Sequence, residues 1–214
     1  MRFYLSSHGV GADAARLAEM AAGRTLGFVP NALDFIAPEL AAESHNRALD
    51  PLRDMGIPIE TLDLRDYFDD HRGLRRRLAD LGGLWLRGGN TFVLREAMRR
   101  SGFDQAIAGI EDPGFLWAGY SAGICVLAPS LKGLQQVDDP SLRPYGEGDP
   151  IFEGLGLLDY LILPHYRSDH FESPKIELEV AFCEEQGIPY RTLRDGEVII
   201  LDGNASDPSG HLNG

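Results

Sequence analysis

The stretch WAGYSAGICVLAPS, residues 117–130, decides the fold of this 214-residue chain. It places Ser121 between Gly119 and Gly123, after one apolar run and before another. A serine at a sharp strand-to-helix turn is held in a strained backbone conformation, and flanking glycines leave room for neighbouring chain to approach closely. The pattern therefore predicts a strand before Ser121 and a helix after it, with the serine hydroxyl projecting from the edge of a sheet.

Apolar runs rich in β-forming residues alternate with segments of helical spacing along most of the chain. The runs cover residues 2–7, 25–30, 57–64, 83–88, 114–120 and 160–165. Many of the helical segments between them end at a glycine, as helices commonly do. Apolar strands separated by amphipathic helices are typical of a parallel sheet covered on both faces. We therefore predict a doubly wound α/β fold with a mostly parallel sheet.

The C-terminal part follows a different pattern. The pair Asp195 and Gly196 lies between two apolar runs, which is the signature of a tight turn, so we predict a β-hairpin within residues 189–203. Residues 1–203 are expected to form a single domain, because the length and the 43% of hydrophobic residues suit one continuous core. Residues 204–214 are expected to be a mobile tail.

The composition argues against several classes of function. Acidic residues outnumber basic ones by 33 to 20, a net charge of −13 that repels phosphate backbones and anionic lipids. We therefore expect no nucleic-acid partner and no membrane partner. Cys125 and Cys183 lie in no metal-binding spacing and suggest no disulfide framework. This favours a cytoplasmic protein with no metal and no cofactor.

The residues that follow each strand are the candidates for a site, since ligands of doubly wound sheets bind beyond the carboxyl ends of the strands. Ser121 is a candidate nucleophile, and the backbone N–H of Ala122, at a helix N-terminus, is suited to a developing negative charge. Gly88 and Gly89 follow another strand and can supply a second N–H donor. Asn90 or Thr91, directly after them, is expected to cap the next helix. Ordinary packing turns at both places are the simpler alternatives.

A serine nucleophile needs a base, and the chain has six histidines. Three of them are expected to be solvated: His45, His71 and His211. We predict that His165 is the base, because it directly follows an apolar strand and so lies at the same sheet edge as Ser121. His170, with Glu172 two residues further on, is the nearest rival, and His8 after the first strand is a third candidate.

The base must itself be oriented by an acceptor, usually a carboxylate on its other nitrogen. Asp195 can return beside His165 after the intervening helix. Glu197 is a competitor, and so are Asp138 and Asp139 in the polar segment 133–150, and spacing alone does not choose among them. That segment is too long for a routine connection and forms either a flap over the site or a solvated loop.

Together these residues resemble those of the peptidase E family, the α-aspartyl dipeptidases, with cyanophycinase as a more distant relative. The resemblance covers the chain from the first strand to about Asp202. Its carriers are RGGNTFVL (87–94), GYSAG (119–123) followed by Pro129, GLGLLDYLILPHY (154–166) and LRDGEVII (193–200). The resemblance implies a class I glutamine amidotransferase-like fold, which is also flavodoxin-like.

The family resemblance also implies roles for single residues. Ser121 would be the nucleophile, His165 the base and Asp195 the acid of the triad, where the family has a glutamate. Asp138 matches a further aspartate that has been implicated in the family. Aspartyl-specific members hold the substrate's carboxylate with an arginine after the histidine, and the corresponding segment here offers only Arg167 and Lys175.

The function that the resemblance implies is that of a cytoplasmic serine peptidase. It would hydrolyse short peptides through an acyl-enzyme, dipeptides with N-terminal Asp among them, and a homodimer is a candidate assembly. Two alternatives stay open. One is a non-catalytic protein that binds a small metabolite on the same fold, and the other is an amidase or esterase with the same triad.

Overall fold

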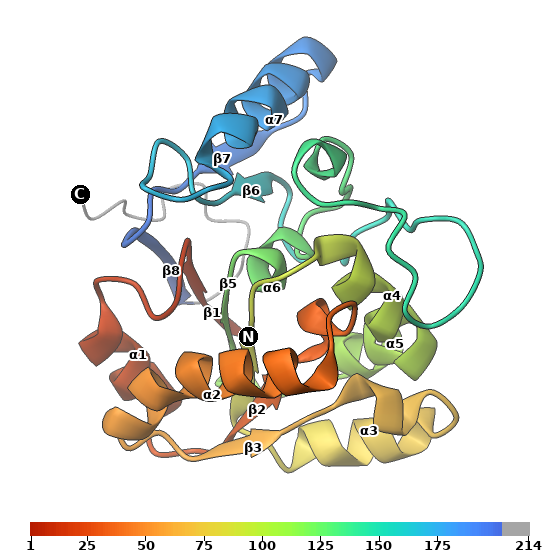
Figure 1. Ribbon diagram of the computed structural model, residues 1–214. Coiled ribbons are helices and arrows are strands. Elements are labelled where there is room, and N and C mark those ends of the chain that lie inside the picture. Colours follow the sequence, from red (N-terminus) through yellow and green to blue (C-terminus); the bar gives the residue numbers. More distant parts are fainter. Residues whose placement is uncertain (203–214) are drawn as a thin grey trace.

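A computed structural model describes residues 1–202 and shows an α/β fold around a six-stranded sheet (Figure 1). All neighbouring strands are parallel except the last, which runs antiparallel to the first. The prediction of a doubly wound, mostly parallel α/β fold is confirmed. In sheet order the strands are β3 (Ile59–Thr61), β2 (Leu26–Val29), β4 (Gly83–Leu86), β5 (Leu116–Tyr120), β1 (Arg2–Ser6) and β8 (Val198–Asp202).

Helices cover both faces of this sheet, because successive side chains of a strand point to opposite faces. Trp85 of β4 packs with Leu17 of α1 (Ala14–Ala21) and Leu52 of α2 (Pro38–Asp54) on one face. Its neighbours in β4 point to the other face, where the remaining sheet helices lie. These are α3 (His71–Ala79), α4 (Thr91–Ser101), α5 (Phe103–Ala108) and the short α6 (Ala122–Cys125).

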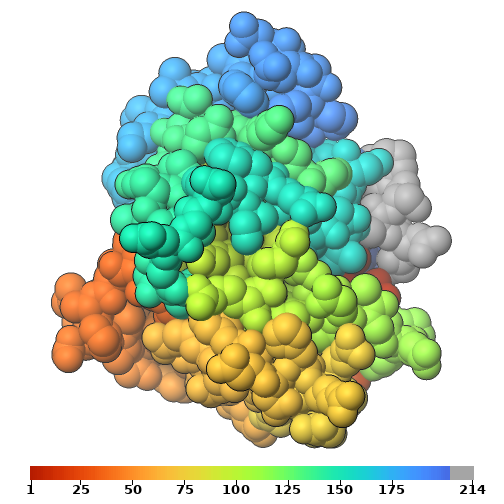
Figure 2. Space-filling view, turned by 90° about the vertical axis from the view of Figure 1, so that its right-hand side faces the viewer, coloured from red at the N-terminus to blue at the C-terminus, as the bar shows by residue number. Residues whose placement is uncertain are grey.

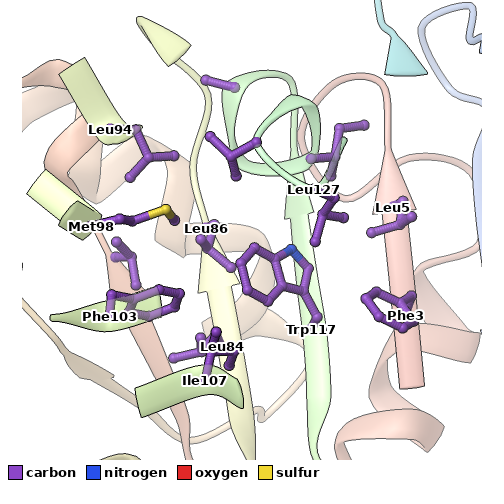
Figure 3. Packing of buried hydrophobic residues seen from close by; sticks show 14 of the residues in the cluster. Phe3, Leu5, Leu84, Leu86, Leu94, Met98, Phe103, Ile107, Trp117 and Leu127 are labelled. Carbon is purple, nitrogen blue, oxygen red and sulfur yellow. The ribbon is translucent and has the colours of Figure 1, made fainter. Parts of the chain in front are cut away.

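The second face holds the larger apolar core. Figure 3 shows the Trp117 ring of β5 beside Leu86, with Met98 of α4 and Phe103 of α5 on the same side of the sheet. Trp117 is fully buried and its indole N–H donates to the Gly123 carbonyl at 3.1 Å. This contact ties the start of α6 to the strand that precedes it. Among the described residues, no helix combines the length and the apolar character needed to cross a membrane.

Two predictions about the C-terminal part were wrong. β6 (Leu161–Leu163) does not join the main sheet, but forms a separate parallel pair with β7 (Tyr190–Thr192) beside α7 (Ser173–Gln186). The predicted β-hairpin does not form, because β7 pairs with β6 whereas β8 pairs with β1 along its whole length. The turn at Asp195 therefore connects two sheets.

Several further segments complete the fold. Short 3-10 helices cover Asn31–Leu33, Leu64–Tyr67 and Leu134–Gln136. Apart from the last of these, residues 133–150 are irregular, and in Figure 2 they lie, green to teal, on the surface between α4 and α7. A third apolar cluster joins α7 and β6 to the chain around α6. Residue 203 and the predicted tail lie outside the described residues.

Candidate active site

Ser121 lies at the turn between β5 and α6 with φ 51° and ψ −122°, a backbone conformation that is strained for a non-glycine residue. A Cβ atom at Gly119 would come within 2.5 Å of the Leu86 carbonyl oxygen, and one at Gly123 within 2.4 Å of the same atom. Real Cβ contacts are not this short, so both positions require glycine. The strand, the strained serine and the helix therefore form the strand-to-helix turn that the sequence predicts at Ser121.

The predicted oxyanion donors surround this turn. Ala122 is the first residue of α6, and within residues 1–202 no acceptor takes its backbone N–H or that of Gly89. A Cβ atom at Gly88 would lie 2.9 Å from the Ser121 Cβ atom, so the glycine turn after β4 lies directly beside the serine. Asn90 caps α4 by accepting from the Val93 N–H at 2.9 Å.

His165 follows β6 and is only 2% exposed. The expectation that it shares a sheet edge with Ser121 was wrong, because β6 belongs to the second sheet. Its side chain nevertheless lines the same cavity as Ser121. Its φ of 61° is again strained, and its backbone N–H donates to the Ser7 hydroxyl oxygen at 2.8 Å.

Asp195 is the acid that contacts the imidazole. Its Oδ1 lies 2.7 Å from Nδ1 of His165 and accepts from the Ser7 hydroxyl at 2.9 Å. Its backbone N–H donates to the Ser168 hydroxyl at 2.7 Å, which fixes the turn. Burial opposes ionisation of this carboxyl group, but the hydrogen bonds from His165 and Ser7 lower its pKa below the ordinary value. Asp195 is therefore ionised and holds Nδ1–H of His165 in place.

The competing acids have other partners. Glu197 accepts from the Arg194 N–H at 2.7 Å and closes the turn. Asp138 accepts from the Thr91 N–H at 2.8 Å, at the start of α4, and burial raises its pKa to about 6. Asp139 accepts from Ser141. None of the three forms a hydrogen bond with a histidine in the described part of the chain.

The imidazole of His165 is neutral at physiological pH. Burial and the neighbouring His170 lower its pKa to about 4, although Asp195 acts in the opposite direction. The His170 ring stacks on it with a centroid distance of 3.7 Å and an interplanar angle of 8°. With Nδ1 engaged by Asp195, the lone pair of a neutral His165 resides on Nε2 and is available to accept a proton.

Three histidines meet at the mouth of the site. Nitrogen atoms of His8, His165 and His170 all lie within 4.8 Å of one another, so these side chains could hold a metal ion. A metal ion bound to Nε2 would occupy the lone pair that the predicted role of His165 as a base requires. The arrangement therefore brings together the predicted base and both of its rivals.

Two cavities meet at Ser121 and His165. The larger, about 840 Å³, is lined by the turn after β4, by Tyr120 and by part of the segment 133–150, which thus forms one wall of the site. The smaller, about 20 Å³, lies toward α7. Within residues 1–202 the structure shows no hydrogen bond between the Ser121 hydroxyl and His165.

The two residues predicted to contact a substrate carboxylate do not line either cavity. Arg167 lies at the surface and forms an ion pair with Glu177 at 2.9 Å. Lys175 is exposed on α7. Their positions give no support to that role.

The sequence interpretation gave no role to three residues around the site. Ser7 directly follows β1 and binds both His165 and Asp195, and its place after a strand was the available signal. Glu172 was noticed only as a neighbour of His170, yet its Oε2 lies 4.0 Å from His165 Nε2. Glu179 is buried on α7, where it interrupts an apolar stripe between Ile176 and Cys183 at helical spacing. A charged residue in such a stripe was the signal.

Comparison with known proteins gives a consistent result. Residues 12–207 match peptidase family S51. The chain is 32% identical over 188 residues to a peptidase E from Streptomyces coelicolor, covering 86% of this chain and 70% of that protein. It is 27% identical over 179 residues to an uncharacterised peptidase from Listeria innocua, covering 84% and 81%.

Solved structures show the same fold. A crystal structure from Listeria monocytogenes EGD-e superposes with a TM-score of 0.71 at 22% identity and covers 94% of this chain and 93% of the other. A peptidase from an acI-B1 Actinobacterium gives a TM-score of 0.63 at 15% identity, covering 94% and 82%.

Proposed function

This chain belongs to peptidase family S51, and from that premise we propose that it is a serine peptidase that hydrolyses short peptides with Ser121, His165 and Asp195. The observation that carries the proposal is the 2.7 Å contact between Asp195 and His165 Nδ1, in a cavity that also contains a strained Ser121. A carboxylate that orients a buried imidazole beside a serine elbow is the arrangement that nucleophilic acyl transfer requires.

In the first half of the reaction, Nε2 of His165 takes the proton from the Ser121 hydroxyl as its oxygen attacks the peptide carbonyl. No hydrogen bond joins the pair within residues 1–202, and such bonds commonly shorten when substrate binds. Asp195 stabilises the imidazolium that forms. His165 then gives the proton to the leaving amine, which departs and leaves an acyl group on Ser121.

The backbone N–H groups of Ala122 and Gly89 are the proposed donors to the oxyanion. They have no other acceptor within residues 1–202, so they need not break a protein hydrogen bond to bind it. In the second half of the reaction a water molecule gives a proton to His165 and attacks the acyl carbon. The acid is released and Ser121 is regenerated.

The position of Arg87 favours a short substrate with a free carboxyl terminus. Its side chain is 6% exposed and lines the larger cavity. Its Nε donates to the Gly88 carbonyl at 2.8 Å, but Nη1 has no partner within residues 1–202. Nη2 donates to the Ser44 hydroxyl at 3.2 Å, so the guanidinium is held in place, and its free Nη1 beside the glycine turn suits the terminal carboxylate of a dipeptide. Both cysteines are free and buried, which agrees with a cytoplasmic location.

The test is hydrolysis of a panel of dipeptides and of their C-terminal amides. We expect turnover that Ser121→Ala reduces by about 10³-fold or more, because the nucleophile is lost. Ser130→Ala, which removes a hydroxyl outside both cavities, is the matched control and should retain activity. Absence of turnover across the panel, or activity that survives Ser121→Ala, would contradict the proposal.

A further inference from the structure

The smaller cavity beside Ser121 is lined by three acidic side chains: Asp138, Glu172 and Glu179. Its volume of about 20 Å³ holds roughly one water-sized group. Within residues 1–202, no lysine or arginine forms an ion pair with any of these three carboxyl groups. Lys175 still acts on Asp138 and Glu172 from a longer distance and lowers their pKa values, but no lysine or arginine in the described chain acts on Glu179 in this way.

Glu179 is the member of this set that points to a ligand. It is 2% exposed, and its Oε2 is buried with no hydrogen-bond partner in the described chain. A buried oxygen without a partner is costly, and a structure keeps few of them. Because Glu179 lines the cavity, a donor bound there would satisfy that oxygen.

The protonation of the cluster fits the same interpretation. Burial and the two neighbouring acids raise the pKa of Glu179 to about 9, and burial and Asp138 raise that of Glu172 to about 7. A cation bound beside these carboxyl groups would displace their protons, since a positive charge favours the ionised carboxylates.

Given the proposed function, on which this inference rests, we propose that the smaller cavity binds the side-chain ammonium of the substrate residue whose carbonyl Ser121 attacks. An ammonium group is close to water in size and fits the cavity, whereas a guanidinium is larger. Leu134 and Ile176 also line the cavity and offer apolar contact to the methylene group that carries the ammonium. The enzyme would then prefer an N-terminal lysine, and would disfavour the N-terminal aspartate that the family resemblance implied.

The test compares the binding of L-lysine and L-norleucine by calorimetry to the full chain with Ser121→Ala. The two amino acids share the α-ammonium, the carboxylate and the four-carbon stem, and differ only in the terminal ammonium. We expect lysine to bind at least about tenfold more tightly, because norleucine leaves the carboxyl groups unsatisfied. Adding Glu179→Gln should reduce this ratio about tenfold, and adding Glu185→Gln, an exposed position on the same helix, should preserve it.

Equal affinity for lysine and norleucine would overturn the inference, since a site for the α-ammonium alone gives that result. Tighter binding of L-aspartate than of L-lysine would overturn it as well. The comparison in the Ser121→Ala protein does not depend on whether the Glu179→Gln variant folds. It does not depend on catalysis either, so a chain that hydrolyses no peptide fails the proposed function, and one that shows no lysine preference fails only this inference.

Discussion

Asp195 and Glu197 are two residues apart but have different contacts. The Asp195 carboxylate binds the His165 imidazole, whereas that of Glu197 accepts a backbone N–H within its own turn. We predict that Asp195→Asn lowers kcat by about 10²- to 10⁴-fold, because the amide cannot hold the correct tautomer or stabilise the imidazolium. Glu197→Gln is the matched control and should change kcat less than about threefold, as it only weakens the turn. Equal losses in the two variants would contradict the assignment of the acid.

His165 gives a second prediction at the residue scale. Its pKa is lowered to about 4 by burial and by His170 against an ordinary value of 6.5, so it should stay neutral down to about pH 4. Nuclear magnetic resonance of ring-labelled histidine, with His165→Gln to assign the signal, measures this directly. Titration of His165 near pH 6.5 would show that the imidazole is not buried as described.

The lowered pKa of His165 also makes the free energy of unfolding depend on pH. The unfolded chain binds a proton at His165 below about pH 6.5, whereas the folded chain does so only below about pH 4. Between these values the unfolded state holds more protons, so this group makes the free energy of unfolding rise with pH. Above about pH 6.5 His165 is neutral in both states, so the free energy of unfolding no longer changes with pH through this group.

At the scale of elements, the close packing of α6 against β4 determines the backbone position of the turn at Ser121. Gly123 has no room for a side chain, since an added Cβ would meet the Leu86 carbonyl at 2.4 Å. We predict that Gly123→Ala lowers the free energy of unfolding by about 1–3 kcal/mol, because backbone must move. Gly109→Ala is the control. An added Cβ there has 3.5 Å to its nearest neighbour, so urea unfolding should show a change within about 0.5 kcal/mol.

The elements also show which parts of the fold could be predicted from the sequence and which could not. The Ser121 elbow was predictable because its requirements are local: an apolar strand, two glycines and an apolar helix start. The partner of β6 was not, since a strand pairs with whichever edge is free. Here β8 occupies the free edge of β1. For the same reason β7 and β8 pair with other strands and do not form the expected hairpin at Asp195. The turn between them still brings the Asp195 carboxylate to His165.

For a related reason, sequence analysis could not predict that the acids of the smaller cavity lie together. Glu172 and Glu179 lie on or beside a helix whose position depends on the second sheet. Spacing along α7 indicates which of its residues are buried, but not which cavity they line. Asp138 comes from an irregular segment with no periodicity to interpret.

At the scale of the whole molecule, the expected single domain has a direct test. Trp85 and Trp117 are both fully buried and lie in the apolar clusters on opposite faces of the sheet. If residues 1–203 fold as one cooperative unit, tryptophan fluorescence of Trp85→Phe and of Trp117→Phe should each follow the same unfolding transition as circular dichroism of the same variant. Separate midpoints for the two probes within one variant would indicate two independent units.

The central claim is that Ser121 is an activated nucleophile, and reaction with a fluorophosphonate tests it most directly. Mass spectrometry of the treated, folded protein should find one adduct per chain on the peptide that contains Ser121, and Asp195→Asn should slow its formation. A folded protein that remains unmodified, or that carries its adduct on another residue, would contradict the account.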